Sequence, residues 1–410
     1  MIAPERTSMV VEKIAIERKL AQLRYQIETS VPKNDTLLSG RIGRMVYYFY
    51  LFRYYQDELF GERAVAILEE IVSNIQEKTS PYLLKYPFSF GLSGFGYVMS
   101  LLIEEGIIDI DFEDQLVEFD ELIYQGALPE LAKGNTDYLH GGMGAVLYLT
   151  RRLKNPAVRP YLETMVSILD QLAIRDERGL RFPNTHIARM NQSDNINLGL
   201  AHGLCGILLI LMRIHEQGIA QPLIETMVSE GIRYLMSFRT PPDPQQGKYS
   251  QFPLTIDENS PLDSPENSKE YGARLGWCYG DLNEMMLLYQ AGKRMHRPDW
   301  TALADDIGAV VIKRHSPRET IIRDSHFCHG TAGVSQYYKR FYDLTGQTVY
   351  LEAYRHWIAK TVDFLEEELT SPVYASHAGE LLEGFVGSSL VLLSSVSDED
   401  YAWDRIFLLS

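Results

Sequence analysis

Cysteine is scarce in this sequence. The 410 residues contain only three cysteines, Cys205, Cys278 and Cys328. An odd and sparse set in a chain of this length argues against a framework of disulfide bonds and favours metal binding or catalysis. A long apolar run is also missing, because no stretch reaches the roughly 18 to 20 residues that a membrane-spanning helix needs. The first residues lack the charged-then-apolar pattern of a secretory signal, so we expect a cytoplasmic protein that is not integral to a membrane.

Basic residues are outnumbered. The sequence has 39 lysines and arginines against 55 aspartates and glutamates, which gives a net charge of −16. This charge repels a phosphate backbone, and no basic run with interleaved aromatic residues occurs, so we expect no nucleic-acid partner. The acidic charge could attract a cationic peptide or only keep the protein in solution, and both alternatives remain open. Hydrophobic residues make up 45% of the chain, which is enough for a sizeable core.

A short segment recurs seven times along the chain. In each copy a small, glycine-containing turn leads directly into an apolar helical run, as in LHGGMGAVLYL from Leu139 and LEGFVGSSLVLL from Leu382. The first small residues of the copies are Gly40, Ser93, Gly141, Gly203, Gly280, Gly330 and Gly384. Their spacing of 48 to 77 residues indicates a repeat architecture.

A second helical pattern lies between the copies. Leu162, Met165, Val166 and Leu169 follow the spacing of one buried helix face, with polar residues on the other face, which predicts an outer helix. The more uniformly apolar runs after the glycine turns predict inner helices. Strand periodicity is nearly absent, so the predicted fold class is all-α: an α/α toroid, or barrel, of about seven inner and seven outer helices. An open solenoid of helix pairs has the same periodicity and remains an alternative.

The glycine turns and one long interval add two expectations. We expect glycine at the turns because the inner helices would crowd around a common axis, where only small residues let backbones approach. Segment 239–272, rich in Pro, Asp, Ser, Asn and Gln, predicts a long surface loop or small excursion. This segment could cover the central opening or only decorate the surface. Because the repeat runs through the whole chain, we predict a single domain over residues 1–410.

Two cysteines and one histidine occupy matching positions in the repeat. Cys278 and Cys328 each lie two residues before the glycine of their turn, and His329 directly follows Cys328. If the turns face one another, these side chains converge. Two thiolates and an imidazole suit Zn²⁺ and leave a fourth tetrahedral position for water or substrate. Cys205 lies inside an inner-helix turn, and we interpret it as a small hydrophobic residue.

Three motifs identify a known family. The chain contains AHG from Ala201, WCYG from Trp277 and CHG from Cys328, beside turns such as GLSGFG from Gly91. With these motifs the chain resembles the LanC-type lanthionine cyclases over essentially its full length. The resemblance implies a zinc-dependent enzyme that adds peptide cysteine thiols to dehydroalanine or dehydrobutyrine and so forms lanthionine or methyllanthionine rings. It also implies a toroid of two seven-helix layers, with zinc bound by Cys278, Cys328 and His329.

The resemblance also implies a catalytic set. It matches Asp137 with the family's active-site aspartate, Arg274 with its arginine and His202 with its second histidine. His202 would transfer a proton near neutral pH, and Arg274 would stabilise an enolate. Asp137 could hold His202 in one tautomer or anchor the substrate, and it could instead be a helix N-cap. The family commonly has Pro-Gly where this chain has Leu282-Asn283, so we expect the local turn geometry to differ.

The expected partners follow from the same resemblance. A chain filled by the toroid has no room for a dehydratase domain, so we expect a dehydrated precursor peptide, a separate dehydratase and an exporter complex that brings the protein to the membrane face. One alternative is a LanC-like zinc protein that binds glutathione or other thiols without closing rings. Another is an α/α-barrel glycosidase that uses Asp137 with Asp281 or Glu383, which leaves the cysteines unexplained.

Overall fold

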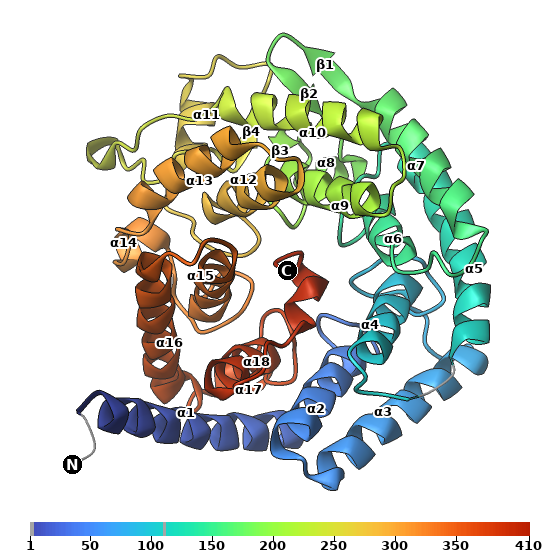
Figure 1. Ribbon diagram of the computed structural model, residues 1–410, viewed down its shortest axis with the longest axis vertical. Coiled ribbons are helices and arrows are strands. Elements are labelled where there is room, and N and C mark those ends of the chain that lie inside the picture. Colours follow the sequence, from blue (N-terminus) through green and yellow to red (C-terminus); the bar gives the residue numbers. More distant parts are fainter. Residues whose placement is uncertain (1–3, 110–111) are drawn as a thin grey trace. The chain divides into compact units, whose positions relative to one another are not determined.

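The computed structural model describes residues 4–109 and 112–410, and the described chain is mostly helical (Figure 1). The chain divides into two compact units. Unit 1 contains Met1–Tyr82 and Arg323–Asp404, and unit 2 contains Leu83–Ile322 and Arg405–Ser410. The single domain expected from the sequence stays a prediction. Within the described residues, no helix is both long enough and apolar enough to span a bilayer.

Unit 1 is built from three helix pairs. Its helices are α1 (Pro4–Thr29), α2 (Arg41–Tyr55), α3 (Glu58–Gln76), α15 (Thr331–Thr345), α16 (Thr348–Glu368), α17 (Pro372–Ala375) and α18 (Phe385–Val396). The helices that follow glycine turns, α2, α15 and α18, are buried along most of their length and pack against α3, α16 and α1 in turn. Helix α1 therefore joins α18 from the opposite end of the sequence (Figure 1).

Unit 2 contributes four more pairs. Its main helices are α4 (Leu92–Glu104), α5 (Glu113–Ala132), α6 (Gly142–Leu149), α7 (Val158–Leu172), α9 (Leu204–Glu216), α10 (Gln221–Met236), α12 (Leu282–Arg294) and α13 (Pro298–Val311). In Figure 1, α5, α7, α10 and α13 form a layer beside the buried helices α4, α6, α9 and α12. With the pairs of unit 1, the predicted inner and outer helices are confirmed.

Short elements of unit 2 lie between these pairs. They are β1 (Ile174–Asp176), β2 (Gly179–Arg181), α8 (Thr185–Asn191), β3 (Ile196–Asn197), η1 (Pro244–Gln246), β4 (Thr255–Ile256), α11 (Pro265–Ser268), η2 (Lys269–Tyr271) and α14 (Pro317–Thr320). Strands β1 and β2 form one antiparallel pair, and β3 and β4 form another. A last short helix, η3, spans Trp403–Phe407.

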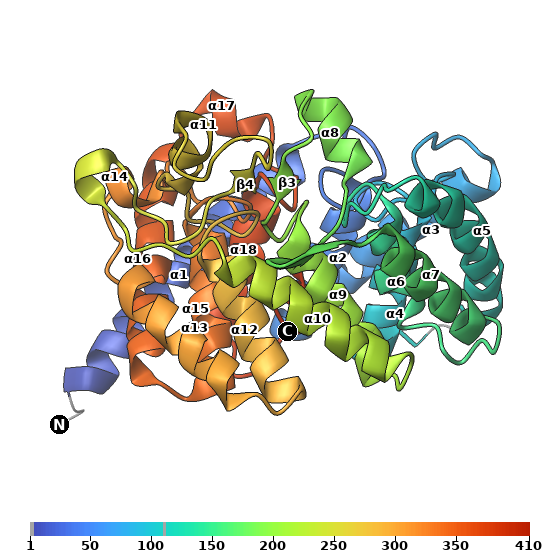
Figure 2. The ribbon, with the colours of Figure 1, turned by 90° about the horizontal axis from the view of Figure 1, so that it is seen from above.

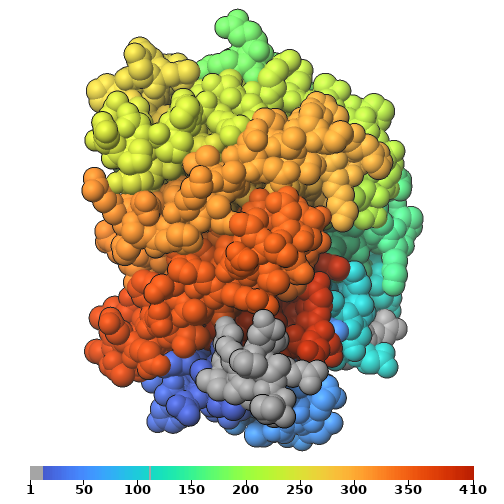
Figure 3. Space-filling model, turned by 60° about the vertical axis from the view of Figure 1, so that its left-hand side comes forward, coloured from blue at the N-terminus to red at the C-terminus, as the bar shows by residue number. Residues whose placement is uncertain are grey.

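The segment predicted as a surface excursion, residues 239–272, contains η1, β4, α11 and η2. It lies on the surface of unit 2, where Figure 3 shows it in yellow-green to gold. Figure 2 shows α11 and β4 with β3 and α8 beyond one end of the helices α9, α10, α12 and α13. Because Ile256 of β4 pairs with Ile196 of β3, the excursion is bonded to the strand that leads into the turn of His202.

The glycine turns determine how the inner helices begin. An extended glycine is the N-cap of six of them: Gly40, Gly91, Gly141, Gly203, Gly330 and Gly384. After Gly141, the N–H of Gly142 donates to the carbonyl of Asn135 at 2.9 Å, and Thr331 donates to Asp324 in the same way at 3.0 Å. Each bond satisfies one of the amides that a helix start leaves unpaired.

The loop that supplies this carbonyl lies too close for a side chain on the glycine. A Cβ on Gly141 would lie 2.6 Å from the carbonyl oxygen of Asn135 and 2.7 Å from the N atom of Asp137. The loop's own backbone therefore requires glycine at this position, whereas the second glycine of the turn meets a neighbouring turn: a Cβ on Gly144 would lie 2.5 Å from Cβ of Phe88. The alignment of Ser93 with the position of Gly141 was wrong, because the N-cap of α4 is Gly91.

The fifth turn differs from the others. The N-cap of α12 is Asp281, and Gly280 has a φ of 113°, in the region that favours glycine. The different turn coincides with Leu282 and Asn283, where the sequence departs from the family pattern.

We expect Gly141→Ala to lower the free energy of unfolding by about 2 kcal/mol, because the added methyl group collides with backbone atoms that cannot move independently. Gly272→Ala is the matched control in the same unit, since a Cβ there would meet only the carbonyl oxygen of Lys269, at 3.6 Å. Thermal and denaturant unfolding followed by circular dichroism measure both variants. Equal stability of the two would show that the turn relaxes and that the close approach is not a constraint.

Candidate active site

Asp137 and His202 meet at the centre of unit 2. Asp137 is fully buried in the turn before α6, where its Oδ1 accepts the N–H groups of Leu139 at 2.9 Å and His140 at 2.8 Å. Its Oδ2 lies 2.8 Å from Nδ1 of His202, in the turn before α9. The pair therefore joins two consecutive glycine turns.

The pair stabilises its own charged form. Burial alone would raise the pKa of Asp137, but the hydrogen bond with His202 and the positive charge of that ring lower it below its ordinary value. Burial alone would lower the pKa of His202, but the hydrogen bond and charge of Asp137, and then the charge of Cys278, raise it. Nδ1–H therefore donates to the carboxylate, which leaves Nε2 as the other protonation site of the ring.

Asn184 holds both partners in place. Its Nδ2 donates to Oδ2 of Asp137 at 3.0 Å and to the carbonyl of His202 at 2.8 Å. Its Oδ1 accepts the N–H of Ile187 at 3.1 Å, so the same side chain caps the start of α8. The amide thus connects the Asp137–His202 pair to the short helix beside it.

Two further histidines surround the pair. The ring of His140 lies 5.7 Å from that of His202 and 4.8 Å from that of His186, measured between centroids. Burial lowers the pKa of His140 to about 4, although the charge of Asp137 opposes this shift, so His140 is neutral at neutral pH. One ligand atom from each of Asp137, His140 and His202 lies within 4.8 Å of the others, a donor set that could hold a metal ion.

The loop of Cys278 is bonded to the turn of His202. Cys278 is buried in the loop before α12, and its carbonyl accepts the N–H of Leu200 at 3.1 Å. In the same loop, the hydroxyl of Tyr279 accepts a hydrogen bond from Nδ2 of Asn197 at 2.7 Å. These contacts place the backbone of Cys278 beside the residues that lead into His202.

Asn283 strengthens this junction. Its side chain is fully buried, with Oδ1 accepting the N–H of Leu200 at 2.9 Å and Nδ2 donating to the carbonyl of Trp277 at 3.0 Å. Other inner helices have glycine at the equivalent position, such as Gly206, where a Cβ would lie 2.1 Å from the carbonyl oxygen of Leu200. Asparagine in the fifth turn therefore replaces close backbone packing with two hydrogen bonds.

Arg274 lies at the start of the same loop. Its side chain is half-buried, and no described residue forms an ion pair with its guanidinium group. Its carbonyl oxygen packs against Gly280, where a Cβ would lie only 2.5 Å away. The backbone of Arg274 is thus held by the turn, and its side chain stays partly exposed.

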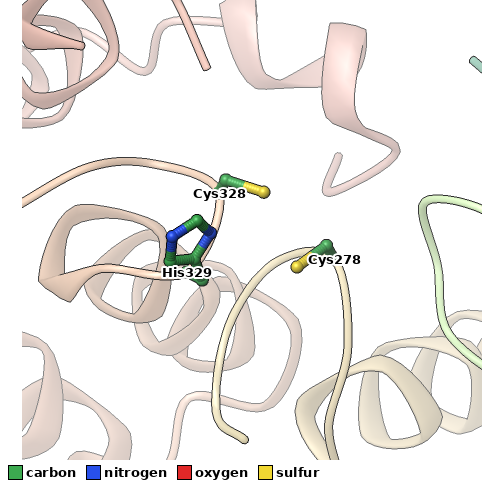
Figure 4. Close-up of side chains that lie close together, drawn as sticks. All are labelled: Cys278, Cys328 and His329. Carbon is green, nitrogen blue, oxygen red and sulfur yellow. The ribbon is translucent and has the colours of Figure 1, made fainter. Parts of the chain in front are cut away.

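Cys328 and His329 lie in unit 1, in the turn before α15. Figure 4 labels them on this turn and labels Cys278 on the loop before α12. Cys328 is buried, and its N–H donates to the carbonyl of Leu382 at 3.1 Å. Nδ1 of the half-buried His329 lies 4.0 Å from a carboxylate oxygen of Glu383. All three cysteines of the chain are described, and none forms a disulfide.

A buried acid anchors the turn of Cys328. Oε1 of Glu368, at the end of α16, accepts the N–H of Ser325 at 2.7 Å, and Oε2 accepts its hydroxyl at 2.5 Å. Burial raises the pKa of Glu368 to about 7, even though both hydrogen bonds oppose this shift. The outer helix thus fixes the loop from which Cys328 projects.

Asp281 has a structural role in unit 2. It is fully buried, accepts the N–H groups of Gln251 and Phe252 at 3.0 and 3.1 Å, and lies 3.2 Å from a guanidinium nitrogen of Arg314. A carboxylate with these partners is not available to act with Asp137 on a glycosidic bond, so the glycosidase alternative loses one of the two acids, Asp281 and Glu383, that could act with Asp137.

One known protein family matches most of the chain. The model of a family described as "Lanthionine synthetase C-like protein" matches residues 31–408. The chain belongs to this family. The resemblance to LanC-type cyclases seen in the sequence motifs is thereby confirmed. No curated protein matches the chain.

One solved structure shares the fold of this chain, and two others match it weakly. Nisin cyclase, a helical toroid, matches with a TM-score of 0.73 and 19% identity over 96% of both chains, which confirms the predicted fold class. A family 76 glycoside hydrolase from a bovine Bacteroides thetaiotaomicron strain has 13% identity over 74% of this chain and 66% of its own, at a TM-score of 0.39. D-mannose isomerase has 10% identity over 77% and 87%, at a TM-score of 0.42. The last two TM-scores are too low to show a shared fold.

The LanC-like motifs did not identify every residue at this site. Neither His186, which packs against His140, nor Asn184, which bonds to Asp137, belongs to these motifs. An asparagine before a short helix signals an N-cap, but nothing in the sequence indicates its bonds to Asp137 and His202. The catalytic roles of Asp137, His202 and Arg274 stay predictions, as do the zinc ligands.

The Asp137–His202 pair gives a titration that can be measured. In Asp137→Asn we expect the pKa of His202 to fall, because the carboxylate charge is lost while burial of the ring remains. Histidine proton resonances followed by NMR from pH 4 to 9 report this shift, and Asp306→Asn, at an exposed carboxylate on α13 of the same unit, should leave it unchanged. An unchanged pKa in Asp137→Asn would contradict the pairing.

The same pair predicts how stability depends on pH. The folded protein holds the His202 proton more tightly than the unfolded chain, so the stabilisation is fully present below pH 6.5. This stabilisation is lost as the pH rises through the pKa of His202 in the folded protein, which is raised above its ordinary value. In Asp137→Asn, the free energy of unfolding should no longer fall over this pH range.

Proposed function

We propose that the chain is a zinc-dependent lanthipeptide cyclase. The observation that carries the proposal is the Asp137–His202 pair, which joins two glycine turns in a chain that belongs to the lanthionine synthetase C-like family. The proposed reaction adds the thiol of a peptide cysteine to dehydroalanine or dehydrobutyrine and forms a thioether ring. The proposed substrate is a dehydrated precursor peptide, made by a separate dehydratase and passed to an exporter complex at the cytoplasmic face of a membrane.

For zinc, the proposed ligands are Cys278, Cys328 and His329. The donor set fits, because two thiolates and one imidazole are ligands that Zn²⁺ prefers and leave one position for the substrate. Both cysteines are buried thiols at matching places in their turns, two residues before the glycine. The carbonyl of Cys278 and the N–H of Cys328 are bonded within their own units, so each backbone is fixed before a metal binds.

Bound zinc would hold the substrate cysteine as a thiolate at neutral pH, where a free thiol with a pKa near 8.5 is mostly protonated. Side chains of the protein would then transfer the protons and stabilise the negative charge. Nδ1 of His202 is occupied by Asp137, so Nε2 is the atom that can take the thiol proton or return one to the substrate. The guanidinium group of Arg274 would stabilise the negative oxygen of the enolate.

The proposed addition balances without any further reagent. A bond forms between the substrate sulfur and the β-carbon, and the electron pair of the carbon–carbon double bond moves to the enolate. The proton lost by the thiol is matched by the proton gained at the α-carbon. No oxidant or reductant is consumed, which agrees with a site built from acid–base and cationic side chains.

A non-cyclising, thiol-binding LanC-like protein is the competing function. The two functions share the zinc ligands and differ in whether His202 and Arg274 have a task. The half-buried guanidinium of Arg274 has no acidic partner among the described residues, so it can meet an anion, and this supports the enzyme.

We expect purified protein to contain one zinc per chain, measured by inductively coupled plasma mass spectrometry. Cys278→Ala and Cys328→Ala should each lose most of it, since a site with two remaining ligands binds far more weakly. Cys205→Ala is the matched control, because Cys205 is buried in α9, with Sγ 3.8 Å from a carboxylate oxygen of Glu284. Full zinc retention in either ligand variant would contradict the assignment.

The second test separates chemistry from metal binding. His202→Asn should keep its zinc but slow cyclisation of a dehydrated peptide by roughly 10² to 10⁴, the usual contribution of a general acid or base. Arg274→Ala should keep its zinc as well and should cyclise the peptide more slowly, because the negative oxygen of the enolate loses its stabilising cation. Mass spectrometry after thiol alkylation counts the unreacted cysteines. Wild-type rates in zinc-replete His202→Asn would rule out proton transfer, and a wild-type protein that cyclises no cognate peptide would favour the thiol-binding function.

A further inference from the structure

A cavity of about 330 Å³ opens beside His202, entirely within unit 2. Its walls come from segment 182–185, α8, β3, the start of α9 and the excursion at Glu258 and Asn259. His202 itself contributes to the wall, with 21% of its side chain exposed. The cavity therefore adjoins His202, the residue that we propose transfers the proton.

The floor of this cavity is apolar. Phe182, Ile196, Leu204 and Ile207 line it, and all four are buried. The volume is at the lower end of the range for ligand pockets, about 300 to 1,000 Å³. Because an apolar cavity of about 150 Å³ already holds a benzene molecule, this one has room for a leucine or phenylalanine side chain.

The polar part of the wall limits which side chain can enter. Three asparagines, Asn184, Asn195 and Asn197, line the cavity with neutral amides. The carboxylate of Glu258 is compensated by the guanidinium groups of Arg178 at 2.7 Å and Arg181 at 2.8 Å. Asp194 adds an exposed carboxylate that no described residue pairs with. An acidic side chain would meet this charge and an apolar floor, so the cavity disfavours it.

We propose that this cavity binds the apolar side chain of the substrate-peptide residue next to the reacting dehydroalanine or dehydrobutyrine. The inference rests on the proposed cyclase function, which brings a peptide to His202. Neighbouring residues of an extended peptide lie about 3.3 to 3.6 Å apart, so the side chain beside a residue reacting at His202 lies within reach of the adjoining cavity. The cavity thus selects which sequence positions are cyclised.

Ala188 on α8 provides the test. Its half-buried side chain lines the cavity, so Ala188→Phe should fill the space from the wall. Met190→Phe is the matched control, since it places the same ring on the same helix at a position that is 65% exposed and outside the cavity. Ala188→Ser controls for any change at the position itself.

The probes are labelled synthetic peptides with one dehydroalanine flanked by leucine, glycine or aspartate, and with serine in place of cysteine so that no ring can form. Fluorescence anisotropy should show that wild-type protein binds the leucine peptide roughly tenfold more tightly than the glycine peptide, as expected for burial of one leucine side chain. The aspartate peptide should bind most weakly. In Ala188→Phe the preference for leucine should disappear, whereas Met190→Phe and Ala188→Ser should keep it.

Two results would overturn the assignment: equal binding of leucine and glycine peptides by wild-type protein, or an unchanged preference in Ala188→Phe with circular dichroism like that of the wild type. The matching peptides with cysteine separate this inference from the proposed function. A leucine preference in binding without any cyclisation would refute the cyclase and leave a peptide site. Cyclisation without a leucine preference would refute only the cavity.

Discussion

Backbone hydrogen bonds between glycine turns hold the residues of the candidate site. In unit 2, the N–H of Ser89 donates to the carbonyl of Leu139, and that of Leu200 donates to the carbonyl of Cys278. In unit 1, Cys328 donates to Leu382. The bonded residues lie two or three positions before the glycine, and they include Cys278, Cys328 and Leu139, which directly precedes His140. Because the glycine lets its loop close onto the helix start, these places are rigid without any ligand.

One position in these turns carries histidine more than once. The residue directly before the glycine is histidine in three turns: His140, His202 and His329. One of them is paired with Asp137, one is kept neutral by burial, and one lies near Glu383. One backbone geometry thus carries both His140, whose pKa is lowered, and His202, whose pKa is raised, because their neighbours rather than the turn set these two pKa values.

The sequence predicted the helix pairs and the all-α class well, because hydrophobic periodicity and recurring glycines are local signals. It missed what depends on contacts between distant segments. Helix α1 packs against α18 from the other end of the chain, and Asn184 reaches Asp137 and His202 from a loop without repeat periodicity. The alignment of Ser93 with the first glycine of the other turns was wrong for a related reason. Only the bond from the N–H of Leu92 to the carbonyl of Lys85 identifies Gly91 as the N-cap.

The fifth turn shows how the repeat can change without losing its function. Here Gly280 takes a positive φ, and Asn283 stands where other inner helices have a glycine that packs on a carbonyl. A buried asparagine needs partners, and it finds them in the carbonyl of Trp277 and the N–H of Leu200. Leu200 lies two residues before His202, and Trp277 directly precedes Cys278. The substitution therefore converts a packing contact within one turn into a link between two turns, so that the positions of Cys278 and His202 depend on each other.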